Sequence, residues 1–283
     1  ARGWYNGADF YDLFGPTKTS RKGYALGGGY KKNLFFDDPR KLDGSFDVDY
    51  FGNLERLPSF QNVVGPKSIL SIEGSLAYKN LRGSMGKVDD EKGVSAEARV
   101  GMDRSAGKSY PKVLGIVDGG LPLPLGHSSV FLRSAAGYAG GERSSPLASF
   151  YFGGFGNNWV DHRDEKRYRT WFAFAGLELN EIPGRSFVKS TLEWNLPPVR
   201  FSRAGRPGFY LAWARPAVFA GVLGTDFEKG STRRIVRNLG GQIDFQLTVL
   251  SALDLTLSAG YARAFEDGRP SRHETMVSLK ILH

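Results

Sequence analysis

The sequence predicts an all-β protein, more specifically a transmembrane antiparallel up-and-down β-barrel of about 12 strands. Apolar and polar residues alternate: within residues 242–251, Ile243, Phe245, Leu247 and Val249 share one face of an extended strand. The pattern recurs about a dozen times with almost no helical periodicity in between. The chain is also rich in glycine (37) and in aromatic residues (20 Phe, 12 Tyr, 5 Trp). These residue types are typical of strand bends and of the aromatic girdles of membrane barrels.

The alternation predicts a strand in each of the following segments: residues 24–36, 46–50, 70–79, 94–103, 112–121, 130–138, 147–155, 188–196, 209–213, 242–251, 253–265 and 275–283. In most of them apolar side chains share one face, and Gly, Ser and charged residues share the other, as lipid-facing and lumen-facing positions should. The phase is ambiguous at residues 112–121. Pro216 cannot donate a ladder hydrogen bond, so we expect it at a bulge or at a shift of phase.

The two ends of the chain differ. Residues 1–20 show no period and are interpreted as a lead-in or linker, which leaves residues 21–283 for the barrel. The last strand places Val277, Leu279 and Ile281 on one face and runs to His283, so we expect it to close the ring. Since the sequence opens on Ala1 without an apolar leader, we expect either a mature product or, in preference, a piece of a longer protein.

The bulk composition is compatible with this fold. A mean hydropathy of −0.32 and a hydrophobic content of 41% resemble those of soluble proteins, but half of each barrel strand faces water. No charge-free apolar stretch approaches the roughly 18 residues of a membrane helix. A soluble β-sandwich would alternate in the same way. The aromatic residues near strand ends and the small or charged second face favour the membrane barrel.

Several function classes are excluded by residue content. The chain has no cysteine, which removes disulfides, metal thiolates and cysteine catalysis. The net charge of +9 comes from scattered basic residues, without a basic face interleaved with stacking aromatics, so we expect no nucleic-acid partner. Phosphates of outer-membrane lipids, including lipopolysaccharide, explain the charge better. No dinucleotide or phosphate-loop motif and no metal-ligand spacing appears, so we expect no cofactor and no metal.

One region carries more specific features. Gly153-Gly154 ends a predicted strand, and a later strand carries the pattern Glu-aromatic-x-aliphatic-Pro in Glu193, Trp194, Leu196 and Pro197. Residues 150–201 therefore resemble the long-loop region of the bacterial surface antigen superfamily, the BamA–TamA type of outer-membrane assembly barrel. The resemblance covers roughly residues 147–283. Arg167-Tyr168-Arg169 stands where that family has an Arg-Gly-aromatic loop tip, without the glycine. Family barrels have sixteen strands, so either this sequence is incomplete and lacks four of them, or it is a smaller relative with about 12.

The resemblance implies a fold and a role. It implies a long loop at about residues 156–186 that folds into the lumen, with Gly153 and Gly154 as its hinge. It also implies an integral protein of the bacterial outer membrane, in a Gram-negative cell, that inserts, exports or anchors polypeptides. Its partners would be the lipid bilayer, a substrate polypeptide or an attached periplasmic domain, and accessory subunits. The first and last strands, near residues 24–36 and 275–283, would pair imperfectly and open sideways.

The loop also has a physical interpretation of its own. A loop of some 30 residues within a compact fold needs a reason, and its charged side chains can be buried only in ion pairs. We therefore expect Arg167 or Arg169 to enter the lumen and pair with an inward carboxylate, Glu193 or Asp244. A solvated surface loop is the alternative.

Two other functions stay open. One is a passive pore or structural anchor with the folded loop as its constriction. The other is a surface hydrolase, for which His162 is the residue to test, since an activated nucleophile needs a histidine base. We expect no catalytic residue and no enzyme activity.

Overall fold

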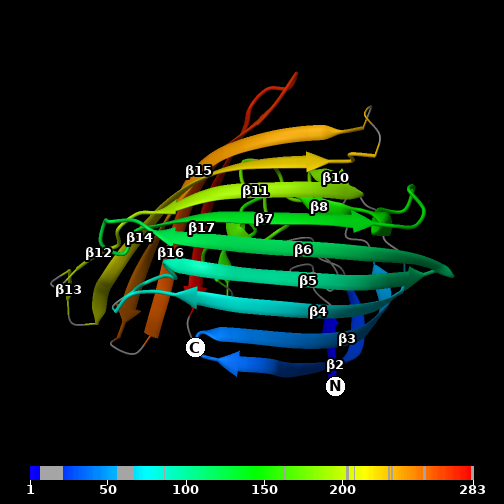
Figure 1. The fold of residues 1–283 in the computed structure, drawn as a ribbon, viewed down its shortest axis with the longest axis horizontal. Coiled ribbons are helices and arrows are strands. Elements are labelled where there is room, and N and C mark those ends of the chain that lie inside the picture. The colour runs from blue at the N-terminus through cyan, green and yellow to red at the C-terminus, as the bar shows by residue number, and fades with distance from the viewer. Residues whose placement is uncertain are drawn as a thin grey trace.

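A computed structural model describes residues 1–6, 22–55, 67–85, 87–161, 164–201, 204–206, 208–228, 230, 232–250 and 253–281. These residues form a twisted antiparallel sheet that follows chain order from β1 to β17 (Figure 1). Its strands are β1 (Arg2–Asn6), β2 (Lys22–Asp37), β3 (Arg40–Glu55), β4 (Ile69–Arg82), β5 (Lys92–Ser105), β6 (Lys108–Pro122), β7 (Ser129–Ala139), β11 (Ser186–Asn195), β14 (Phe209–Thr225), β15 (Arg234–Val249), β16 (Leu253–Glu266) and β17 (Arg272–Ile281).

Short elements lie in the connections. They are η1 (Pro146–Ala148), β8 (Phe150–Phe152), β9 (Val160–Asp161), η2 (Arg167–Arg169), β10 (Ile182–Gly184), β12 (Val199–Arg200) and β13 (Gly205–Arg206). β8 pairs with β10 in a separate two-stranded sheet, β12 and β13 pair with β14, and β9 pairs in parallel with β17. No helix among the described residues is long and apolar enough to cross a lipid bilayer.

In contrast to a soluble β-sandwich, the sheet exposes its apolar face and buries its polar face. On β11, Val188 and Leu192 are 50% and 54% exposed on the convex face, whereas Lys189 and Glu193 are 5% and 0% exposed on the concave face. β5 repeats the pattern, with Val100 65% exposed. Oily residues outside and polar residues inside are the arrangement of a membrane barrel. The fold is the all-β, up-and-down barrel that the alternation predicts, and twelve strands form the path from β1 to β17.

Three expectations need correction. Residues 147–155 do not form a strand of the barrel wall, because β8, in this segment, pairs with β10 in the separate two-stranded sheet. The bulge in β14 lies between Leu211 and Trp213, while Pro216 keeps regular register opposite Ile243. The first strand is not residues 24–36: Arg2–Asn6, within the expected lead-in, pairs with β2. Alternation missed this strand because five residues are too few to establish a period. Residues 7–20, the rest of the lead-in, lie outside the described residues.

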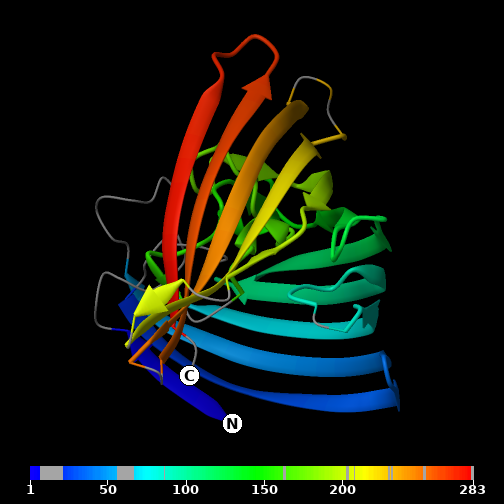
Figure 2. The ribbon, with the colours of Figure 1, turned by 90° about the vertical axis from the view of Figure 1, so that its left-hand side faces the viewer.

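The strand directions define two ends of the barrel. The β4–β5, β6–β7 and β11–β14 connections lie at the end where β17 stops, and the long β7–β11 connection lies at the other, hereafter the long-loop end. Figure 2 shows the elements of the long connection, in green, between the β2–β6 wall and the rising strands β14–β17. The long connection therefore lies on the concave side of the sheet.

Candidate functional site in the barrel lumen

The base of the long loop is fixed by aromatic packing. Phe150 and Phe152 of β8 lie against Phe187 of β11, with ring centroids 5.0 and 4.7 Å apart. Trp171, from the far limb of the loop, stacks on the same Phe187 ring at 6.0 Å. Inward side chains of the barrel wall, Leu223 and Val236 among them, complete this cluster. Burying such rings contributes about 1.5–3 kcal/mol each, so the loop is held inside by a core of its own.

The glycine pair after β8 takes backbone conformations that other residues rarely adopt. Gly153 has φ +150° and Gly154 has φ +72°. The Gly153 N–H donates to the Phe172 carbonyl at 3.2 Å and the Gly154 N–H to the Leu177 carbonyl at 3.1 Å. A Cβ at Gly153 would collide with the Glu178 carbonyl oxygen. This position therefore requires glycine, because the chain turns inward in contact with the returning limb.

Replacing Gly153 by alanine should lower the free energy of unfolding by about 1–3 kcal/mol, the cost of a strained backbone residue. Urea unfolding of the purified barrel in detergent, followed by heat-dependent gel mobility, measures the change. Gly115→Ala is the matched control, because a Cβ there meets no atom within 4 Å; alanine should be neutral or mildly stabilising at that position. Equal stability of the two variants would contradict the hinge assignment.

The loop tip is a single 3₁₀ turn, η2, packed deep in the lumen. Tyr168 is 3% exposed and stacks on Phe219 of β14 with centroids 4.3 Å apart. Arg167 is 6% exposed. Lys166, just before the turn, donates to the Asn195 side-chain oxygen at 2.6 Å. The apolar face of the turn therefore anchors it to the wall while its cations face inward carboxylates.

Arg169 is the centre of an ion network. Its guanidinium donates to both oxygens of Glu193, at 2.6 and 3.0 Å. Glu193 also accepts from Arg133 of β7 at 3.2 Å, and Arg133 in turn donates to Asp118 of β6 at 2.9 Å. The Glu193 side chain is 0% exposed. A carboxylate so deeply buried is stable only with such partners, and the bidentate geometry fixes the orientation of the tip.

A second carboxylate reaches the tip from the opposite end of the barrel. Asp89 lies in the β4–β5 connection and accepts from Arg169 at 2.6 and 3.3 Å and from Lys166 at 3.3 Å. Arg215 of β14 lies 3.7 Å away and donates to the Val88 carbonyl at 3.0 Å. Segments from both ends thus meet in the lumen.

The charges of this meeting point are strongly coupled. Burial raises the pKa of the Asp89 carboxyl, but the charges of Arg169 and Lys166 outweigh burial and hold this pKa well below its usual range. Burial, with a smaller contribution from the neighbouring Arg169 and Arg215 charges, lowers the pKa of the Lys166 ammonium to about 8. The site therefore holds Asp89 ionised at neutral pH.

Asp244 of β15 organises the other side of the lumen. It accepts from Arg215 at 3.2 and 3.3 Å, from Gln242 at 2.7 Å and from Ser258 at 2.7 Å. Gln242 also donates to the Glu165 carbonyl at 3.0 Å. Asp244 therefore supports the loop through Arg215 and Gln242.

The structure thus brings some of the expected site residues together and separates others. Arg169 and Glu193 are in contact, and Arg167 and Tyr168 are buried beside them. Of the two expected carboxylates, Glu193 binds Arg169 of the tip, and Asp244 binds Arg215 of the wall. Sequence reasoning missed Asp89, Arg133 and Arg215. The acidic run Asp89-Asp90-Glu91, in a turn of a basic chain, was the available signal for the first.

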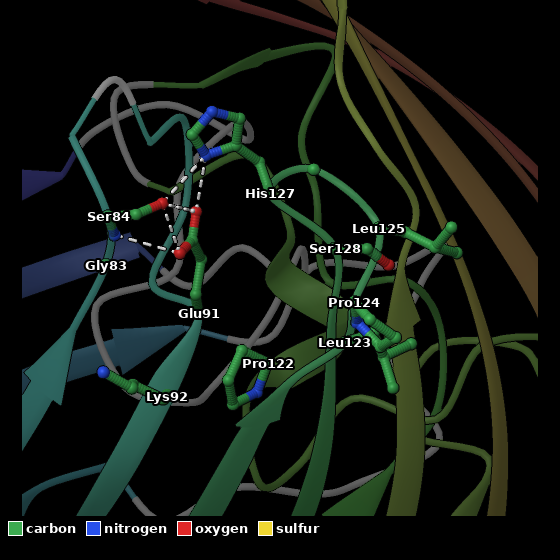
Figure 3. Close-up of a pocket in the computed structure, with 11 residues that line it drawn as sticks. Gly83, Ser84, Glu91, Lys92, Pro122, Leu123, Pro124, Leu125, His127 and Ser128 are labelled. Atoms are coloured by element: carbon green, nitrogen blue, oxygen red, sulfur yellow. Dashed lines mark hydrogen bonds and ion pairs between the residues drawn. The ribbon is translucent and has the colours of Figure 1, made fainter.

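A pocket of about 470 Å³ lies beside this turn, between the β4–β5 and β6–β7 connections (Figure 3). In it His127 Nδ1 lies 2.7 Å from Glu91 Oε1 and 3.1 Å from Ser84 Oγ. Nucleophile activation uses both ring nitrogens, one for the nucleophile and one for the orienting acid. Here one nitrogen contacts both groups, so the cluster cross-links the two turns. His162, the residue of the hydrolase hypothesis, lies outside the described residues, as does His283 of the closing strand.

No protein-family model and no curated protein matches the sequence. The structure is similar to the crystal structure of BamA from Haemophilus ducreyi lacking POTRA domains 1-3, with a TM-score of 0.53 and 16% sequence identity. The alignment covers 98% of this chain and 57% of that chain, so this chain spans little more than half of the other. The likeness extends over the twelve-strand path and the inward loop, and the chain therefore has the fold of a BamA-type outer-membrane β-barrel.

Proposed function

We propose that this chain is an integral outer-membrane barrel that assembles or exports polypeptides by pairing with their strands at a seam between β1 and β17. The observation that carries the proposal is the seam itself. Among the described residues no ladder joins β1 to β17; the sheet path starts at β1 and, beyond β17, holds only the two-residue strand β9. Unpaired strand edges are templates for the addition of another strand.

The two edges of the seam are unequal. β1 covers only five residues of the 16-residue β2, which leaves the rest of that strand without a described neighbour on this side. On β17 the Leu279 N–H donates away from β16, to the Trp159 carbonyl at 2.8 Å. Because backbone groups alternate along an antiparallel strand, the Val277 N–H points to the same side. β17 therefore offers a row of donors and acceptors, of which β9, in the described part of the chain, occupies those at Leu279 and Lys280.

The passive pore is the second candidate, and the filled lumen weighs against it. The tip of the long loop and the β4–β5 connection are ion-paired across the interior, with Lys166 1% exposed and Glu193 0% exposed. A conducting pore needs a continuous water path, whereas strand addition at an edge does not. We include in the assembly proposal the attached soluble domain and the accessory subunits that the resemblance implies.

Val277→Pro tests the seam. Proline removes the N–H that faces the seam while leaving the β16 ladder intact, since Val277 and Ala259 form a pair without ladder bonds. Vesicles containing the full-length protein should accelerate the folding of a urea-unfolded barrel protein over empty vesicles, as followed by heat-dependent gel mobility. Val277→Pro should abolish that acceleration.

Two controls accompany this variant. Val277→Ala changes the side chain but keeps the N–H, so it should retain the acceleration. Ser278→Pro breaks the ladder to β16 and should prevent folding of the barrel itself. A Val277→Pro protein that folds and remains as active as the wild type would refute strand addition at β17. Acceleration by no form of the protein would refute the assembly function.

A further inference from the structure

A basic patch lies on the convex face of β15, β16 and β17, near the long-loop end. Arg263 stands opposite Leu239 on one side and His273 on the other. Arg237 stands opposite Phe265, one row closer to the loops. All of these side chains are exposed, and the residues between them (Val236, Asn238, Ala262 and Ala264) are buried. The basic groups therefore point outward, away from the lumen.

The patch is surrounded by oily surface. Leu239 is 60%, Tyr261 52%, Phe265 44% and Ile235 37% exposed on the same face. Two of these lie farther toward the loops than Arg263, so its cation stands within the apolar band. A lipid-facing arginine costs about 2–4 kcal/mol at the bilayer midplane and about 0–1 kcal/mol near the interface. Arg263 and Arg237 are therefore placed where a headgroup can neutralise them.

The protein orients these cations without neutralising them. Arg263 donates to Ser271 Oγ at 2.7 and 3.1 Å and lies over the Phe265 ring, 5.7 Å from its centroid. Arg237 approaches only Asp267, at 3.8 Å, and that carboxylate is 92% exposed. Two arginines at neighbouring inward positions, in contrast, are paired with a carboxylate: Arg234 and Arg272 both bind Glu266, at 2.8 and 2.7 Å. Within the described residues, then, the outward arginines have no close buried acid.

We infer that Arg237, Arg263 and His273 bind a phosphate group of an outer-leaflet lipid, the phosphorylated diglucosamine lipid A. Two guanidinium groups and an imidazole provide donors that match phosphate oxygens. Tyr261, one row toward the midplane, and Leu239, level with Arg263, are placed to contact the acyl chains. The inference rests on the proposed function for one point, that the long-loop end faces the outside of the cell.

The test uses the full-length protein in detergent and native mass spectrometry to count bound lipid. The probes are lipid A with both phosphates, lipid A with its phosphates removed, and phosphatidylglycerol. Phosphorylated lipid A should bind best, and the double variant Arg237→Gln/Arg263→Gln should weaken it at least about tenfold, as expected for the loss of charge-assisted hydrogen bonds. The matched control, Arg104→Gln/Lys108→Gln, removes two exposed charges at the same end of the barrel but on β5 and β6.

Three outcomes would overturn the assignment. The first is a control pair that weakens binding as much as the test pair, which would mean that only bulk charge matters. The second is equal binding of lipid A with and without its phosphates. The third is equal competition by phosphatidylglycerol, which would make the patch a site for any anionic phospholipid. The Val277→Pro variant should bind lipid A normally, so a failure of this site and a failure of the assembly function are told apart.

Discussion

Glu193→Ala should lower the free energy of unfolding of the barrel by about 3 kcal/mol, because it removes a fully buried carboxylate that two partly buried arginines share. Glu193 accepts from Arg169 at 2.6 Å and from Arg133 at 3.2 Å. Both cations keep one other acidic partner, so the folded barrel should form but unfold at lower urea. Heat-dependent gel mobility across a urea series measures the shift of midpoint.

A double-mutant cycle with Arg169→Ala isolates the contact between loop tip and wall. If the two residues act as one unit, the double variant should be more stable than the sum of the single losses predicts, by at least about 1 kcal/mol. Glu97→Ala is the matched control, since this lumen-facing glutamate pairs with Arg99 and is 27% exposed; its loss should cost less than about 1 kcal/mol. Additive effects of Arg169→Ala and Glu193→Ala would show that the ion pair does not hold the loop.

The alternation of side chains is the part of this fold that the sequence predicts well. A strand buried on one face only repeats every two residues, so β5 and β11 could be located within a few positions. The oily exterior followed from the same pattern, because the second face carries Lys189, Glu193 and Asp244, which a dry core would not accept. The long loop was predicted from a family resemblance and not from side-chain periodicity. The residues that carry the resemblance are Gly153-Gly154 and Glu193-Trp194.

The contacts within the lumen were beyond such reasoning. They join residues far apart in sequence, such as Asp89 and Arg169, whose meeting depends on how two loops from opposite ends are directed. Alternation predicts that a carboxylate faces inward but not which cation it meets, so the ion pair of Asp244 with Arg215 could not be predicted. Very short strands cannot be predicted from alternation either. β1 is recognised only through its ladder to β2.

Asp89→Asn should open the lumen to ions. The carboxylate lies between Arg169, Lys166 and Arg215, and the isosteric amide would leave these three cations facing one another. Their repulsion should separate the loop tip from the β4–β5 connection, since breaking a buried pair costs about 3–5 kcal/mol. We expect open probability in planar bilayers to rise at least about tenfold, the effect of about 1.4 kcal/mol.

The neighbouring Asp90 provides the matched control, because it pairs with Lys87 at 2.7 Å and Lys79 at 3.7 Å, away from the loop tip. Asp90→Asn should leave the wild-type conductance unchanged.

The pH dependence of conductance supplies an independent check. A carboxylate whose folded pKa is depressed stabilises the folded state above its unfolded pKa, about 3.9, and loses this effect only as pH falls through the folded value. The wild-type lumen should therefore stay closed from neutral pH to about pH 5, while the Asp89→Asn lumen conducts throughout. Equal conductance of the two variants would place the seal elsewhere than at Asp89.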